Sequence, residues 1–556
     1  MPDMWTISCL LFVVSISFAG IVSGEVFTAM ADVEELLESE KEVVETLEAY
    51  LFAEEIRLEK IRRFTNEFKD LYAKASNDLE SFISHPVNTY LFVKRLTSDW
   101  KEAEDVLNQQ LGREYLEIIY KMRSNMPFPT DEDLTGVAIA LSRLQDTYRI
   151  DSDHIAKGKI KGVSKSPQLS PSECFELGRV LYNFKDYDHS IDWMKTTLHR
   201  FDETPAVITA DNGTIGVTRA DAFEYLAFSN YMKGNVREAL KFTNLLLAYE
   251  PTHERAQNNV AYYEKEIAAA SQGRKRGDDG DTAMARKGTI ELRPDSWENE
   301  KRTYQMLCRG EKQANASVAR HLNCYYESSH PFLKIQPIKT ELLHLDPKIV
   351  MFHEVASDKE IATIKTLAGP RLMRATVQNS LTGELETAHY RISKSAWLNS
   401  KDDRVVELIN QRIGMLTGLD MDYAEELQIA NYGIGGHYEP HFDFARKAES
   451  KAFTSLGMGN RVATFLLYMT DVEAGGGTVF PRLNLSLWPK KGSAAFWYNL
   501  YKNGEGDLRT RHAACPVLSG VKWVSNKWIH EYGQEARRPC GLQSDGFEPD
   551  EIDTDS

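Results

Sequence analysis

Three residues in the last third of the chain have the types and spacing of a metal site. His441 and Asp443 are separated by one residue. In a β-strand such residues point to the same face, so an imidazole and a carboxylate can reach one point. His512 follows after several β-rich runs, which is enough chain to return on a neighbouring strand. Two histidines and one carboxylate leave three positions open, the arrangement that non-haem Fe(II) oxygenases use. A lone His-x-Asp is usually incidental, so the assignment depends on its context.

Lys522 supplies that context. It lies ten residues past His512 on another β-rich run. Two of the open iron positions would hold a chelating oxo-acid and the third dioxygen, and the lysine ammonium could meet the far carboxylate of that oxo-acid. Without the triad, the simpler interpretation is a solvated lysine on a strand. With the triad, the sequence favours a lysine that binds a dicarboxylate cosubstrate.

Four β-rich runs, separated by Gly-rich turns, must position these residues. They are ELQIANY (426–432), RVATFLLYM (461–469), SAAFWY (493–498) and KWVSNKWIHEY (522–532). Short runs rich in β-branched and aromatic residues are typical of strands. The sequence therefore predicts an all-β or α+β catalytic domain over residues 344–540, rather than a parallel α/β domain.

The N-terminal part has a helical period instead. From Met30 to about Leu107, apolar residues recur at spacings of three and four, with Glu and Lys between them. The apolar seam is narrow, and the segment contains no Pro before Pro86. Such a seam suits a coiled coil or a helix-pair dimer, while an ordinary helical bundle is an equal alternative. We expect a helical dimerisation domain over residues 25–150.

A helical repeat follows over residues 165–270. Leu177-Gly178 and Tyr182 align with Leu226-Ala227 and Tyr231, a pattern that resembles tetratricopeptide helix pairs. The offset exceeds the usual period of about 34 residues because of an inserted loop around Asn212. Most of the many aromatic residues must form the core, but tyrosines on a concave helical surface suit a Pro-rich chain in the polyproline II conformation. The tyrosines that we expect to contact such a chain are Tyr182, Tyr225, Tyr231 and Tyr262.

Composition and terminal segments indicate a secreted or luminal globular protein. The formal net charge of −16 argues against nucleic-acid binding. Residues 1–24 are interpreted as a signal peptide, although the absence of Lys and Arg before the apolar stretch leaves an uncleaved anchor open. No other run approaches membrane-spanning length. Residues 271–300 are Gly- and charge-rich and are interpreted as a linker, and residues 541–556 as a solvated acidic tail.

Six cysteines and three glycosylation sequences agree with an oxidising compartment. The spacing suggests two local disulfides, Cys308 with Cys324 and Cys515 with Cys540, which leaves Cys174 free in a helical region. Reduced cysteines are the alternative. Each Asn-x-Ser/Thr triplet is individually common by chance. The candidate acceptors are Asn212, Asn315 and Asn484.

The runs ANYGIGGHYEPHFDFARK, GGGTVFPRLNLSLWPKKGSAAFWYNL and GEGDLRTRHAACPVLSGVKWVSNKWIHEYGQE resemble the 2-oxoglutarate dioxygenases, and among them the collagen prolyl 4-hydroxylase α subunits. The resemblance extends upstream to the N-terminal helices and covers essentially the whole mature chain. It implies a multidomain protein, with coiled-coil-like and tetratricopeptide-like helical domains followed by a double-stranded β-helix (jelly-roll) dioxygenase domain.

Residue by residue, the resemblance implies that His441, Asp443 and His512 bind iron, and that Lys522 pairs with the 5-carboxylate of 2-oxoglutarate. It implies supporting roles for four further positions. Tyr432 and Thr478 would flank the cosubstrate, His530 would assist its orientation, and Tyr438 would lie near the target proline. The four paired cysteines also fall at family positions. His437 and the Gly475–Gly477 run depart from the usual motif.

The implied reaction is hydroxylation at C4 of proline in Xaa-Pro-Gly sequences of collagen-like chains, coupled to decarboxylation of 2-oxoglutarate to succinate and CO2. The resemblance also implies Fe(II), ascorbate, and an α2β2 tetramer with protein disulfide isomerase in the lumen of the endoplasmic reticulum. One alternative is another peptidyl dioxygenase, such as a lysyl hydroxylase or an oxygen-sensing prolyl hydroxylase, but these typically carry Arg at the position of Lys522. Another is a non-catalytic scaffold for Pro-rich chains, which would need no iron site.

Overall fold

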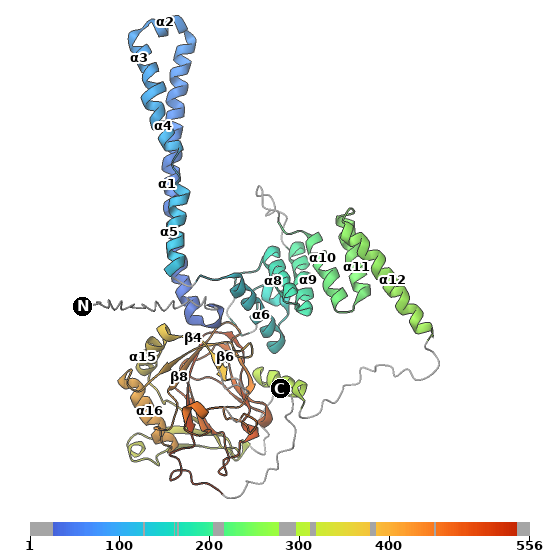
Figure 1. The fold of residues 1–556 in the computed structure, drawn as a ribbon, viewed down its shortest axis with the longest axis vertical. Coiled ribbons are helices and arrows are strands. Elements are labelled where there is room, and N and C mark those ends of the chain that lie inside the picture. Colours follow the sequence, from blue (N-terminus) through green and yellow to red (C-terminus); the bar gives the residue numbers. More distant parts are fainter. Residues whose placement is uncertain are drawn as a thin grey trace, which may run out of the picture.

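The computed structural model shows a long helical arm, a helical repeat and a β-rich domain (Figure 1). It describes residues 26–125, 128–160, 162–163, 166–203, 216–276, 296–311, 319–378, 385–449 and 452–541. The predicted signal peptide, most of the predicted linker, the acidic tail after residue 541, Asn212 and Asn315 lie outside these residues. In the described part of the chain, no helix combines the length and apolar character needed to cross a membrane.

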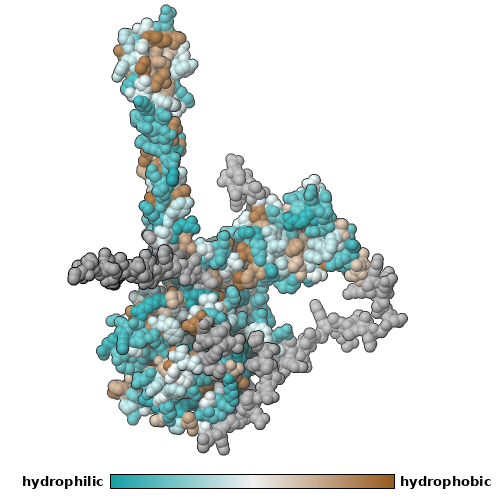
Figure 2. Space-filling view, in the orientation of Figure 1, coloured by the Kyte–Doolittle hydropathy of each residue, from teal (hydrophilic) through white to brown (hydrophobic). Residues whose placement is uncertain are grey.

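The arm is a helical hairpin. After the short turn η1 (Val26–Thr28), the 48-residue helix α1 (Met30–Asn77) runs outward, and the chain returns alongside it. The returning elements are α2 (Leu79–Ser84), α3 (Pro86–Lys94), η2 (Arg95–Asp99), α4 (Trp100–Leu107) and α5 (Leu111–Asn125). Two helices cannot bury a complete apolar face, so large apolar side chains such as Leu51, Leu79 and Phe92 remain exposed. Figure 2 shows apolar surface at the tip of the arm, where Figure 1 places α2 and α3.

The repeat consists of packed helix pairs, as the sequence pattern predicts. Helices α8 (Pro171–Asn183) and α9 (Tyr187–Glu203) pack together, and so do α10 (Arg219–Met232) and α11 (Val236–Tyr249). Capping boxes begin α8 and α10. Helix α12 (Glu254–Arg276) packs on α11 and extends into the segment expected to be a linker.

The β-rich domain contains a nine-stranded sheet with the order β1-β2-β3-β14-β10-β17-β8-β7-β4 and a four-stranded sheet with the order β13-β12-β15-β9. Every pairing is antiparallel, and an apolar cluster that includes Leu466, Phe480 and Val524 links the two sheets. Helices α15 (Asp358–Ala368) and α16 (Arg404–Thr417) pack against the larger core cluster on β7 and β10. This double-sheet domain confirms the predicted fold class.

The large sheet comprises β1 (Cys324–Glu327), β2 (Ile338–His344), β3 (Ile349–Phe352), β4 (Met373–Arg374), β7 (Lys394–Leu398), β8 (Leu427–Tyr432), β10 (Arg461–Tyr468), β14 (Ala494–Tyr498) and β17 (Lys522–His530). The small sheet comprises β9 (Tyr438–His441), β12 (Thr478–Phe480), β13 (Leu485–Leu487) and β15 (His512–Ala514). Two-stranded ribbons pair β5 (Thr376–Gln378) with β6 (Leu385–Thr387), and β11 (Ala474–Gly475) with β16 (Val517–Ser519). Short helical turns are η4 (Pro331–Lys334), η5 (Gly369–Arg371), η6 (Thr454–Leu456), η7 (Pro481–Leu483) and η8 (Leu508–Thr510). Strands β1 and β2 belong to the large sheet and begin before the expected domain start at residue 344, so the sheet extends further toward the N-terminus than predicted.

Helix α6 (Asp131–Tyr148) contacts both the repeat and the β-rich domain. The Trp193 indole of α9 donates to the Gln145 side chain at 2.9 Å, and the short helix α7 (Ser152–Ala156) also packs on α9. On the other side, Arg143 donates to the Gly435 carbonyl oxygen at 3.1 Å and Tyr148 donates to the Pro516 carbonyl oxygen. The repeat is therefore fixed against the loops that precede β9 and follow β15.

The predicted disulfide pairing is wrong. Cys308, at the end of α13 (Trp297–Cys308), is bonded to Cys515, with the two Cα atoms 5.5 Å apart, while Cys324 and Cys540 are exposed thiols. Helix α13 packs on the small sheet, where Leu307, Cys308 and Cys515 belong to one buried cluster. This long-range packing, rather than spacing along the chain, selects the partner. Cys174 is free and buried in α8, as expected.

Candidate active site

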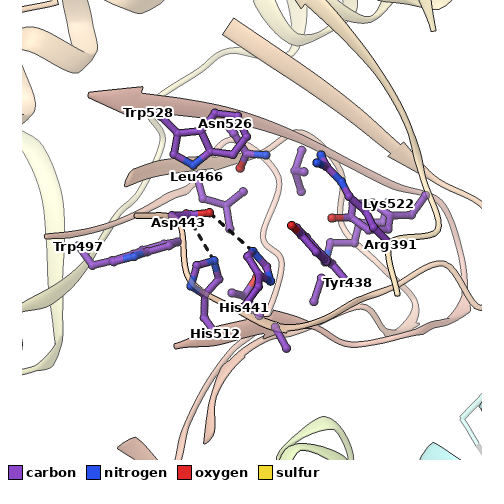
Figure 3. Close-up of a pocket in the computed structure, with 15 residues that line it drawn as sticks. Arg391, Tyr438, His441, Asp443, Leu466, Trp497, His512, Lys522, Asn526 and Trp528 are labelled. Carbon is purple, nitrogen blue, oxygen red and sulfur yellow. Dashed lines mark ion pairs between the residues drawn. The ribbon is translucent and has the colours of Figure 1, made fainter. Parts of the chain in front are cut away.

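The metal-type cluster is assembled by one strand pair. Strands β9 and β15 are antiparallel, with His441 directly opposite His512, and Asp443 lies two residues beyond the end of β9. The Asp443 carboxylate oxygens lie 3.6 Å from His441 Nε2 and 3.5 Å from His512 Nε2. One potential ligand atom from each residue lies within 4.8 Å of the others. The three side chains converge on one point (Figure 3).

Hydrogen bonds orient all three side chains. The Nδ1–H groups of His441 and His512 donate to the carbonyl oxygens of Glu439 and Thr510, at 2.8 and 3.0 Å. Both Nε2 atoms therefore present their lone pairs to the centre of the cluster. The Thr464 hydroxyl donates to Asp443 Oδ2 at 2.8 Å, and this threonine accepts from the Asn499 amide at 2.9 Å.

The electrostatics suit a divalent cation. Burial alone would raise the pKa of Asp443, but His512 and His441 overcome that effect and hold it well below its usual range. Burial lowers the pKa of His512 to about 4, against the opposing attraction of Asp443. The site thus offers a carboxylate and a neutral imidazole at neutral pH, the protonation states that metal ligands require. Two imidazoles and one carboxylate are the donor set of non-haem Fe(II) sites, so the residues present fit that ion.

A buried cation shares the same pocket. Lys522 is 1% exposed and faces Tyr432 across β17 and β8, with its Nζ 4.8 Å from the Tyr432 ring centre. No carboxylate among the described residues forms an ion pair with it, and burial lowers its pKa to about 7. A buried ammonium without an anion is costly, and the far carboxylate of a dicarboxylate would satisfy it. Thr478, the third expected cosubstrate residue, also lines the pocket and accepts a hydrogen bond from Tyr468 at 2.8 Å.

Two other expected residues have different positions. Tyr438 lines the pocket and stacks on His441, with ring centres 3.5 Å apart. His530 is not among the residues that line the pocket. Both of its ring nitrogens form hydrogen bonds outside it, to the Gly459 carbonyl oxygen at 2.7 Å and the Glu425 carboxylate at 2.9 Å. His530 pairs with Arg461 of β10 where the register of the two strands shifts. The expected direct role of His530 in orienting the cosubstrate therefore has no support in this geometry.

Sequence reasoning missed several pocket residues. Asn526 and Trp528 follow Lys522 at even spacings on β17 and therefore share its face, a signal that strand alternation could have revealed. Arg391 also lines the pocket and lies over the Tyr438 ring at 5.0 Å. Its Nη atoms donate to the Thr376 carbonyl oxygen and the Gln428 side chain. Arg391 is far from the motifs in sequence, and no local pattern marks it.

The four expected substrate tyrosines lie on one aromatic surface of the repeat. Tyr182 of α8 contacts Tyr225 of α10 edge to face, with ring centres 4.8 Å apart. Tyr231 stacks on Tyr263 at 5.1 Å and contacts Tyr262 of α12 at 5.9 Å. Tyr262 is exposed, whereas Tyr263 is buried. Among the predicted glycosylation acceptors, Asn484 lies in the described part and is exposed.

Family models match three segments of the chain. The family described as prolyl 4-hydroxylase α-subunit, N-terminal region, matches residues 29–162. The prolyl 4-hydroxylase peptide-substrate-binding domain matches residues 171–269, and the 2OG-Fe(II) oxygenase superfamily matches residues 427–530.

Individual relatives extend over almost the full length. Prolyl 4-hydroxylase subunit alpha-2 of Caenorhabditis elegans is 46% identical over 95% of this chain and 95% of its own. Prolyl 4-hydroxylase subunit alpha-1 of Homo sapiens is 45% identical over 93% of this chain and 95% of its own. A solved structure of a viral collagen prolyl hydroxylase from Paramecium Bursaria Chlorella virus-1, in complex with 2OG, is 23% identical. It covers 33% of this chain and 94% of its own, with a TM-score of 0.26.

Proposed function

The chain belongs to the prolyl 4-hydroxylase α-subunit family, and we propose that it hydroxylates C4 of proline in Xaa-Pro-Gly sequences of collagen-like chains. It is an Fe(II)- and 2-oxoglutarate-dependent dioxygenase, which converts its cosubstrate to succinate and CO2. The observation that carries the proposal is one pocket that contains both the two-histidine, one-carboxylate cluster and a buried lysine with no ion-pair partner among the described residues.

His441, Asp443 and His512 would hold the iron, and Lys522 would bind the distal carboxylate of 2-oxoglutarate between Tyr432 and Thr478. Bound iron supplies the activation of dioxygen, with electrons that come from decarboxylation of the cosubstrate. The chain contributes orientation, because the hydrogen bonds to both histidine Nδ1 atoms fix the ring planes. We expect a requirement for ascorbate, which is typical of this family.

Buried aromatic side chains enclose the His512 ring on one side of the pocket. Trp497 and Phe480 pack against the His512 ring, at 4.9 and 5.5 Å between ring centres, and both are buried. Tyr438 covers the His441 ring and would face the target proline. A dry site strengthens each electrostatic contact to the bound cosubstrate.

The aromatic surface of the repeat would hold the polypeptide substrate. Tyr182, Tyr225, Tyr231 and Tyr262 present rings on which the flat rings of a polyproline II chain can stack. Helix α6 fixes this surface against the β-rich domain through Gln145 and Arg143. A long substrate would therefore occupy the repeat while one of its prolines is in the pocket.

The proposed assembly is an α2β2 tetramer in the lumen of the endoplasmic reticulum, with protein disulfide isomerase as the β subunit. The exposed apolar residues of the arm support pairing of two α subunits along it. The Cys308–Cys515 disulfide supports an oxidising compartment.

The test uses the full-length chain co-expressed with protein disulfide isomerase and a (Pro-Pro-Gly) repeat peptide. Mass spectrometry after incubation with Fe(II), 2-oxoglutarate and ascorbate should show one added oxygen on prolines that precede glycine, at C4. A peptide that stays unmodified while the enzyme binds 2-oxoglutarate would point to a different peptidyl substrate. Oxygen added at C3 of proline or on lysine in a matched peptide would contradict the proposed specificity.

A further inference from the structure

The base of the arm contacts the strand that carries Tyr432. The Gly433 amide, directly after β8, donates to the Thr28 carbonyl oxygen at 2.9 Å. A side chain at Gly433 would lie 1.9 Å from the Phe27 carbonyl oxygen, so only glycine allows this close approach. The segment Val26–Asp32, here called the base segment, is therefore packed directly against the end of β8.

A buried asparagine connects the base segment to Lys522. Asn431 has 0% exposure, and its Oδ1 accepts from the Ala31 amide in the first turn of α1 at 3.0 Å. Its Nδ2 donates to the carbonyl oxygen of Lys522 at 3.3 Å. Asn431 thus joins the arm to the backbone of the lysine that faces the pocket, and it immediately precedes Tyr432.

An ion pair and a second hydrogen bond anchor the base segment. Asp32 lies 2.6 Å from the Nζ of Lys394, and Lys394 is directly opposite Asn431 in the β7–β8 register. The Val26 amide donates to Asp133 of α6 at 2.6 Å. These contacts are buried or nearly so, and they fix the segment on both sides of the Asn431 contact.

We propose that Asn431 is a positioning residue for the cosubstrate site, and that the base segment is a structural part of that site. The inference rests on the proposed function, in which Lys522 and Tyr432 hold 2-oxoglutarate. With Asn431 held by Ala31, the backbone of Lys522 keeps the position from which its ammonium reaches the far carboxylate. When the contact is lost, binding of 2-oxoglutarate weakens, while the iron ligands on β9 and β15 keep their geometry.

The test compares three variants of the full-length chain co-expressed with protein disulfide isomerase. Asn431→Leu removes both hydrogen bonds, Asp32→Asn weakens the ion pair to Lys394, and Glu34→Gln changes an exposed acidic residue on the same helix as the control. Calorimetry with Mn(II)-loaded protein gives the Kd for 2-oxoglutarate. Steady-state assays give the KM values for 2-oxoglutarate and peptide.

Asn431→Leu should raise the Kd and KM for 2-oxoglutarate about tenfold, as expected for a lost buried hydrogen bond, and Asp32→Asn should raise them less. The KM for peptide should stay within about twofold of the wild-type value. General destabilisation would not raise the KM for 2-oxoglutarate while leaving the KM for peptide unchanged. If Asn431→Leu does not fold, the test is the Kd for 2-oxoglutarate of Asp32→Asn compared with that of the control Glu34→Gln. Unchanged 2-oxoglutarate Kd values in the folded variants would overturn the inference while leaving the proposed function intact. Absence of 2-oxoglutarate binding by the wild-type chain would overturn both.

Discussion

His512 lies directly opposite His441 in the antiparallel pairing of β15 with β9, and their rings are 4.4 Å apart. Neighbouring strands of a sheet keep a fixed separation, so this register by itself places two imidazoles at one point. Asp443 reaches the same point from just beyond β9. The pairing of β9 with β15 therefore brings the metal ligands together. The hydrogen bonds to these ligands should determine how tightly the site binds iron.

Thr464→Val should weaken iron binding about tenfold to a hundredfold, the usual effect of removing a hydrogen bond to a metal ligand. The Thr464 hydroxyl holds Asp443 Oδ2 from β10, and valine has nearly the same shape without the donor. Titration of iron against turnover measures the change. Thr464→Ser keeps the hydroxyl and should retain iron affinity close to that of the wild type. Equal iron affinity in the valine and serine variants would show that the hydrogen bond from residue 464 to Asp443 does not contribute to iron binding.

The affinity for 2-oxoglutarate should fall as the pH rises above about 7. Burial lowers the pKa of Lys522 to about 7 in the free protein, so its cationic fraction decreases above that value. Because a carboxylate binds the ammonium form, the Kd for 2-oxoglutarate should rise by about tenfold per pH unit above the pKa. Calorimetry on Mn(II)-loaded protein across this range measures the effect.

Two substitutions control for other titrating groups. Lys522→Arg keeps the charge at all these pH values and should flatten the profile, although its longer side chain will reduce the affinity. Lys522→Met should weaken binding at every pH. A profile that keeps its slope in the arginine variant would assign the titration to a different residue.

The sequence predicted the iron triad and Lys522 because strand alternation and motif spacing are local properties. Alternation along β17 also accounts for Asn526 and Trp528. The role of His530 was implied by the family resemblance alone, and the structure places its ring against Glu425 and the Gly459 carbonyl oxygen. The Cys308–Cys515 bond depends on how α13 packs on the small sheet, and this packing is not encoded in any local pattern. Arg391 was missed because it lies outside the motifs and no local pattern marks it as a pocket residue.

Tyr231→Ala should raise the KM for long Pro-rich peptides by about fivefold, which is the effect of one lost aromatic contact. The same variant should change the KM for a tripeptide only slightly. The Tyr231 ring contacts the rings of Tyr262 and Tyr263 on the aromatic surface, which only a long peptide would occupy together with the pocket. Steady-state kinetics over a series of peptide lengths measures the difference. Tyr326→Ala changes a 63% exposed tyrosine on β1, away from both the arm and the repeat, and serves as the control. An equal KM increase for short and long peptides would contradict a separate peptide-binding surface.

The most direct test measures 4-hydroxyproline and succinate together, using a (Pro-Pro-Gly) repeat peptide and the wild-type or His512→Ala chain co-expressed with protein disulfide isomerase. The wild-type enzyme should form one 4-hydroxyproline for each succinate, and both products should fall to background in the variant while circular dichroism shows the fold retained. Peptide hydroxylation that persists in folded His512→Ala protein would contradict the assignment of the iron site to β9 and β15.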